Sequence, residues 1–157
     1  MLISILKYSE IFKLGKYSNT NELYNSISED IKHSIILVDD DIDVTNILAG
    51  HFALANFKVY KVISAEECLA KLKELESKVD VVLVNGNIAA DRGPMLIVNI
   101  KKLNLKIKIL ALADNENNKT RVLDYGADEF AIKPISPTTI VEKVSGLLMK
   151  KPAELQP

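Results

Sequence analysis

From residue 35 onward, short apolar runs alternate with segments in which apolar residues recur at helical spacing. The apolar runs predict five strands, within residues 35–38, 57–63, 79–85, 107–113 and 129–133. A segment that predicts a helix follows each of these runs. Since parallel neighbours need crossover connections, this alternation indicates a parallel sheet with helices on both faces. The pattern alone leaves the strand order open.

Capping signals place the ends of three predicted helices. Ser64, with Glu67 three residues later, forms a capping box for the second helix. Gly126 is suited to end the fourth helix, and Ser136 caps the last helix with Pro137 at its first position. The first helix is expected to gather its apolar residues on one face, made of Val44, Ile47, Leu48, Phe52 and Ala55.

The chain is expected to form one domain with a segment at each end. Residues 1–33 are rich in Ser, Asn, Tyr and Lys and predict an N-terminal extension that is partly helical or disordered. Residues 34–149 carry the strand and helix pattern, and residues 150–157 form a C-terminal tail. A short helix in the extension is indicated by apolar residues at every fourth position, Leu23, Ile27 and Ile31.

Composition argues against several classes of protein. With 20 basic and 21 acidic residues the net charge is −1, which favours neither nucleic acid nor a membrane surface as partner. Cys68 is the single cysteine and is expected in the core, while His33 and His51 lack zinc spacing. Lys7 and Glu10 interrupt the apolar start, so we expect a soluble cytoplasmic protein.

Polar side chains follow three of the predicted strands. The aspartates 39–41 come directly after the first strand, Asn85 ends the third, and Lys133 follows the fifth. The carboxyl ends of parallel strands meet at one edge of the sheet, so these side chains are expected to converge on one crevice. An alternative to a functional role is that Asp39 and Asp40 pair with Lys133 and fix the strand ends.

Residues 34–149 resemble a response-regulator receiver domain of two-component signalling. The matching pieces are ILVDDD, DVVLVN, DRG and YGADEFAIKP, of which the last is the most specific. The resemblance implies a flavodoxin-like, doubly wound sheet of five parallel strands in the order 2-1-3-4-5. It also implies a protein that is not an enzyme.

Carried over by this resemblance, the acidic pair that holds Mg²⁺ is Asp39 and Asp40, and the Lys that meets phosphoryl oxygens is Lys133. Asn87 stands where a backbone carbonyl helps bind the metal. Asn85 stands where the family has the Asp that is phosphorylated. An amide nitrogen delocalised into its carbonyl is a very poor nucleophile, so Asn85 is not expected to be phosphorylated.

Two further positions belong to the switch of the family. Ala113, or Ala111 if the following loop is full length, stands where a Thr or Ser bonds the phosphoryl group. Phe130 stands at the switch aromatic. With Asn85 neutral, Asp39, Asp40 and Lys133 carry about −1 instead of −2, so no cofactor is required and Mg²⁺ binding is expected to be weak.

The resulting hypothesis is a stand-alone receiver-like domain that acts by protein contact without phosphorylation. Its partner is expected to be a signalling protein or histidine kinase that docks on the face of the fourth helix, fifth strand and fifth helix. The chain itself is expected to be a monomer or homodimer. One alternative is a receiver phosphorylated on Asp91 or on a deamidated Asn85. Another is a small flavodoxin-like enzyme or ligand-binding protein, although neither a nucleophile–base pair nor a cofactor motif is evident.

Overall fold

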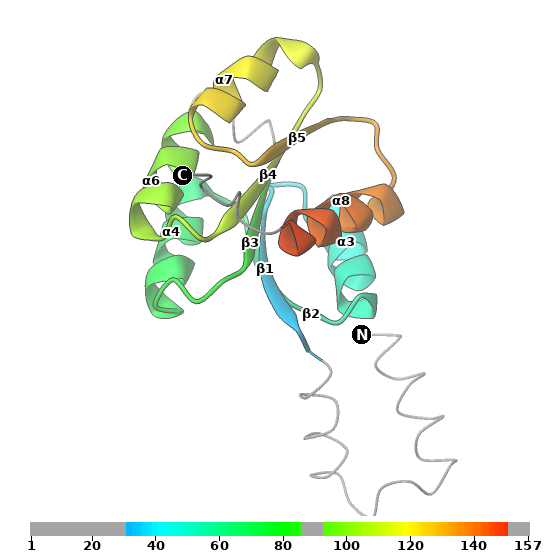
Figure 1. The fold of residues 1–157 in the computed structure, drawn as a ribbon. Helices are drawn as coiled ribbons and strands as arrows, with labels where there is room; N and C mark the ends of the chain where they lie inside the picture. The colour runs from blue at the N-terminus through cyan, green and yellow to red at the C-terminus, as the bar shows by residue number, and fades with distance from the viewer. Residues whose placement is uncertain (1–30, 86–92, 151–157) are drawn as a thin grey trace, which may run out of the picture.

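The computed structural model describes residues 31–85 and 93–150 and contains a five-stranded parallel sheet in the order β2-β1-β3-β4-β5 (Figure 1). This is the order expected from the family resemblance. The strands are β1 (His33–Val38), β2 (Phe57–Val62), β3 (Val81–Asn85), β4 (Lys108–Ala113) and β5 (Glu129–Ile132).

Helices cover both faces of the sheet (Figure 1). One face carries α3 (Ile42–Leu54) and α8 (Pro137–Met149). The other carries α4 (Ala65–Glu74), α6 (Gly93–Leu103) and α7 (Lys119–Asp124), with a 3-10 turn, η1 (Glu116–Asn118), before α7. Among the described residues, no helix is long and apolar enough to cross a membrane.

The central strands are buried on both faces, which explains their continuous apolar runs. In β1, Ile36 and Val38 pack toward α4, α6 and α7, while Ile35 and Leu37 pack toward α3 and α8. The parallel register pairs Val38 with Val84, so the carboxyl ends of β1 and β3 lie side by side. The polar residues that follow these strands therefore start from one edge of the sheet.

The predicted helix ends are present, with one difference at α4. The Ser64 side chain accepts a hydrogen bond from the Glu67 backbone N–H, but the Glu67 carboxylate accepts from the backbone N–H of Ile63 and not of Ser64. Gly126 has a φ of 111° after α7, and the Gly126 and Ala127 N–H groups bond back to α7 carbonyls as in a Schellman motif. The Ser136 hydroxyl accepts from Thr139 N–H, with Pro137 at the start of α8.

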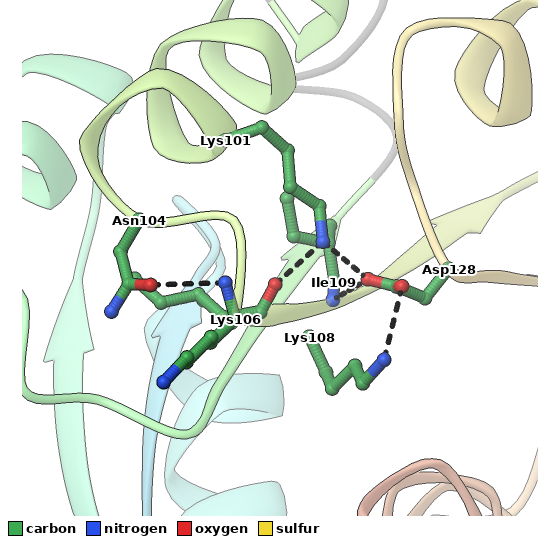
Figure 2. A network of polar contacts seen from close by, with 7 residues as sticks. Lys101, Asn104, Lys106, Lys108, Ile109 and Asp128 are labelled. Atoms are coloured by element: carbon green, nitrogen blue, oxygen red, sulfur yellow. Dashed lines mark hydrogen bonds and ion pairs between the residues drawn. The ribbon is translucent and has the colours of Figure 1, made fainter. Parts of the chain in front are cut away.

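A network of polar contacts joins α6, β4 and β5 at the amino ends of the strands (Figure 2). The Asp128 carboxylate accepts hydrogen bonds from the Lys101 ammonium and the Ile109 backbone N–H, both at 2.8 Å, and lies 3.6 Å from the Lys108 ammonium. Lys101 also donates to the carbonyl of Ile107 at 2.6 Å. These partners come from α6 and β4, and Asp128 itself directly precedes β5, so Asp128 holds three parts of the fold together.

Two expectations about individual helices have different outcomes. Cys68 is fully buried in the core, as predicted, and burial raises its pKa from 9.0 to about 12. On α3, by contrast, Val44 and Ile47 are 42% and 56% exposed, although Leu48 and Phe52 on the expected face are buried. The α3 face that meets the sheet instead includes buried Thr45, whose hydroxyl donates to the Asp41 carbonyl.

His33 is the first residue of β1, and its Nδ1 lies 3.8 Å from the Asp80 carboxylate. Its ring also packs against Phe57. The helix expected in the extension lies mostly outside the described residues.

Candidate functional site

Asp39, Asn85 and Lys133 come together at the carboxyl ends of the strands, as the sequence predicted. The Asn85 amide Nδ2 donates a hydrogen bond to Asp39 Oδ2 at 2.5 Å, and the Lys133 ammonium donates to Asn85 Oδ1 at 2.6 Å. Asp39 and Asn85 are buried, and Lys133 is partly exposed. The three side chains form one chain of polar contacts across β1, β3 and the segment after β5.

The charges on either side fix the orientation of the Asn85 amide. A carboxylate only accepts hydrogen bonds and an ammonium only donates them. The amide satisfies both, because its NH₂ group faces Asp39 and its carbonyl oxygen faces Lys133. Reversing the amide would bring a donor to Lys133 and an acceptor to Asp39, so this site has one favourable arrangement.

The acid that pairs with Lys133 differs from the expected one. We expected Asp39 and Asp40 to pair with Lys133, but the Lys133 ammonium lies 3.5 Å from Asp114 Oδ1. Asp39 reaches Lys133 only through the Asn85 amide, since its Oδ2 accepts from that amide and its Oδ1 accepts from the Asp41 backbone N–H at 2.9 Å. The buried carboxylate is thus satisfied by uncharged donors.

Sequence reasoning missed Asp114, although a signal for it was present. Asp114 directly follows β4, so it starts from the same edge of the sheet as the residues after the other strands. The parallel register aligns Ala113 with Ile132, and the Lys133 backbone N–H donates to the Ala113 carbonyl at 2.8 Å. This alignment places the two following residues, Asp114 and Lys133, next to each other.

The other two aspartates after β1 differ in what they do. Asp41 is the N-cap of α3, where its side chain accepts from the Val44 N–H, in line with its predicted place in the turn. Asp40 is exposed. The expected acidic pair therefore consists of one buried and one exposed carboxylate.

The described residues form a poor set of ligands for Mg²⁺. This ion demands near-octahedral coordination by oxygen, usually with carboxylates. Asp39 already accepts hydrogen bonds at both oxygens, and Asn85 directs its nitrogen, not its oxygen, toward Asp39. No cluster of three His, Cys, Asp or Glu side chains suited to a metal occurs within residues 31–85 and 93–150. Asn87, the third expected ligand, lies outside these ranges, as does Asp91.

The two switch positions lie on β4 and β5. Ala113 is buried at the end of β4, and Ala111, the alternative position, is aligned with Phe130 in the register. Phe130 is partly buried and packs against the core on the side of α4, α6 and α7. Neither alanine has a side-chain hydroxyl to donate to a ligand at this edge.

The described cluster is a chain of hydrogen bonds and one ion pair that joins two carboxylates and one ammonium. Asp39 and Asp114 are negative, Lys133 is positive, and Asn85 joins the buried acid to the lysine without adding charge. A second carboxylate at position 85 would face Asp39 at close range, where two like charges repel strongly. The amide removes this repulsion.

Comparisons with known proteins agree with this fold. Residues 35–145 match the response regulator receiver domain family. The chain is 26% identical to the response regulator SaeR of Staphylococcus aureus over 121 residues. The aligned region covers 74% of this chain and 52% of SaeR. The chain thus spans about half the length of this curated relative.

Solved structures give the same fold. A CheY-like receiver domain from Methanospirillum hungatei has a TM-score of 0.66 at 24% identity, covering 74% of this chain and 93% of that one. A two-component response regulator from Clostridium difficile has a TM-score of 0.68 at 21% identity, covering 76% of this chain and 98% of that one. At such identities these likenesses show the fold alone, but the family match spans most of the sequence. The chain therefore belongs to the response regulator receiver domain family.

Proposed function

We propose that this receiver domain signals through protein contacts without being phosphorylated. The proposal rests on the side chain of Asn85, which stands where the family resemblance places the phosphoacceptor Asp. An amide there lacks the nucleophilic oxygen anion needed to form an acyl phosphate. Its two polar atoms are also engaged with Asp39 and Lys133, the residues assigned to the metal and the phosphoryl group.

The proposed role needs no metal and no catalytic step by the chain itself. Lys133, which would otherwise meet phosphoryl oxygens, is held by Asn85 and Asp114. Ala113 offers no hydroxyl that could link a phosphoryl group to the loop after β4. Both observations support a domain that keeps one arrangement at this edge, instead of switching between two as phosphorylated domains do.

The test is phosphorylation of the full chain by a small phosphodonor. The chain is incubated with acetyl phosphate and Mg²⁺, and its intact mass is measured. We expect no gain of a phosphoryl group. An Asn85→Asp variant treated in parallel serves as the matched control, because it restores a carboxylate at the same position, and we expect it to gain one phosphoryl group.

A phosphoryl group on the unaltered chain would contradict the proposal, and its position would identify the alternative. Phosphate on Asp91 would favour a displaced acceptor. Phosphate on residue 85 would favour deamidation, since Asn85 precedes Gly86, which leaves the backbone nitrogen free to attack the amide. Peptide mass spectrometry of this segment separates the two.

For the partner, we propose the face formed by α7, β5 and α8. Leu123, Tyr125 and Ile132 are large apolar residues at least one-third exposed along α7 and β5. Beside them, the Lys143 ammonium of α8 lies 3.0 Å from the Glu129 carboxylate of β5, which fixes the helix against the strand. A surface with exposed apolar side chains suits a signalling protein such as a histidine kinase.

A further inference from the structure

A cavity of about 450 Å³ lies between α3, the carboxyl end of β4 and the segment that leads from β5 into α8. Its size falls within the range of about 300–1,000 Å³ typical of small-molecule sites. A second hollow on the other side of Asp39 has only about 120 Å³ and falls below this range. The larger hollow is open to solvent on the side of α3, where Val44 and Ile47 are exposed.

Most of the cavity wall is aliphatic. On α3, Val44 and Ile47 remain 42% and 56% exposed at the cavity, although they belong to the apolar side of the helix. Leaving these side chains in water is unfavourable, and an apolar body that covered them would be stabilised. Six aliphatic residues line the space: Val44, Ile47, Leu48, Leu112, Ile135 and Ile140.

The polar groups of the cavity belong to the cluster at the strand ends: Asp39, Asn85, Asp114 and Lys133. The Lys133 ammonium has three N–H donors. One reaches Asn85 Oδ1 at 2.6 Å, and Asp114 lies at 3.5 Å, which leaves a donor for a further acceptor. Asp39 and Asp114 would repel an anion, and Lys133 would repel a cation. A neutral hydroxyl fits, because it can accept from Lys133 and donate to a neighbouring carboxylate oxygen.

We infer that this cavity binds a small neutral amphiphile with an apolar body and one hydroxyl group, of the alcohol or phenol class. The body would lie against the aliphatic wall, and the hydroxyl would meet Lys133 and Asp114. This inference goes beyond the proposed function and is independent of it, because such a ligand could bind whether or not residue 85 accepts phosphate.

The test uses four naphthalene-based probes and the full chain: naphthol, unsubstituted naphthalene, naphthoate and naphthylmethylamine. Dissociation constants are measured by ligand-observed NMR. We expect naphthol to bind at least about tenfold more tightly than the other three, since a hydrogen bond to a charged group is worth about 1.5–3 kcal/mol and each 1.4 kcal/mol is tenfold. Tighter binding of the carboxylate or the amine, or no naphthol binding, would overturn the inference.

Two variants on the same helix locate the site. Ile47→Trp should fill the cavity and weaken naphthol binding by about tenfold or more. Leu54→Trp is the matched control, because Leu54 is 49% exposed on α3 and does not line the cavity, and its binding should stay within about twofold of the unaltered chain. Equal effects of the two variants would place the probe elsewhere and contradict the inference.

The Lys133→Met variant tests whether the Lys133 ammonium binds the hydroxyl group of the ligand. We expect this variant to bind naphthol and naphthalene with similar affinity, because the ammonium donor is gone while the aliphatic wall remains. A variant that kept the full preference for naphthol would contradict the role of Lys133. Retained naphthalene binding in the same sample shows that the cavity is intact, so misfolding cannot account for the expected result.

Discussion

Two clusters of polar side chains lie at opposite ends of the sheet. At the amino ends of the strands, the Asp128 carboxylate is surrounded by Lys101, Lys108 and the Ile109 N–H (Figure 2). At the carboxyl ends, an uncharged amide, Asn85, stands between Asp39 and Lys133.

The two clusters differ in how charge is arranged. Around Asp128, opposite charges touch directly, and each contact joins two segments of the fold. Around Asn85, the buried acid and the lysine are kept apart by the amide, and a cavity lies beside them. The first arrangement is suited to holding the fold together. The second leaves Lys133 and Asp114 partly exposed beside the cavity.

Removal of the Asp128 charge should have the largest effect on stability. We expect Asp128→Asn to lower the free energy of unfolding by about 2–3 kcal/mol, because the partly buried Lys101 ammonium loses its charged partner. Urea denaturation measures this difference. A loss below about 0.5 kcal/mol would show that this cluster does not hold the segments together.

A carboxylate at position 85 should lower the stability by a smaller amount, through repulsion between like charges. We expect Asn85→Asp to lower the free energy of unfolding by about 1–2 kcal/mol at neutral pH without metal, because its charge would face Asp39 where Nδ2 now donates. Urea denaturation of the variant at lower pH should show part of this loss recovered, since protonation removes the repulsion. A variant as stable as the unaltered chain would contradict this reading of the amide.

The buried Cys68 thiol should make the stability of the chain depend on pH in the alkaline range. Burial raises the pKa of this thiol to about 12, so between about pH 9 and pH 12 the thiol ionises only in the unfolded chain. Stability is then lost as pH rises, by about 1.4 kcal/mol per unit within that window. We expect Cys68→Ala to lack this part of the slope in urea denaturation at several pH values. If the free energy of unfolding fell equally steeply with pH in the variant and in the unaltered chain, Cys68 would not be the source of this pH dependence.

The smallest effect is expected for an exposed pair near the amino ends of the strands. The Lys78 ammonium lies 2.8 Å from the Glu76 carboxylate, but both side chains are at least three-quarters exposed. We expect Lys78→Ala to change the free energy of unfolding by no more than about 0.5 kcal/mol. A loss comparable to that of Asp128→Asn would show that burial does not explain the importance of Asp128.

The periodic pattern predicted the helices and strands well, because burial of the central strands on both faces leaves continuous apolar runs in the sequence. The strand order came from the family resemblance and not from the pattern. Convergence of Asp39, Asn85 and Lys133 was also predictable, since parallel strands place the residues that follow them at one edge.

Two features of the site could not be predicted, because they depend on distances between side chains that the sequence does not reveal. The choice of Asp114 over Asp39 as the partner of Lys133 depends on where side chains lie within a few ångströms. Likewise, helical spacing identified the apolar side of α3 but not the cavity that leaves Val44 and Ile47 exposed. Periodicity indicates which face is apolar, and only packing against neighbouring segments decides how much of that face is covered.

The central claim is that the Asn85 amide takes the place of a carboxylate and its metal ion. It is tested most directly by thermal unfolding of the unaltered chain and of Asn85→Asp over a range of Mg²⁺ concentrations. We predict that Mg²⁺ leaves the Tm of the unaltered chain unchanged and raises that of the variant, because only the variant presents two facing carboxylates to the ion. An equal rise in both proteins would contradict the account.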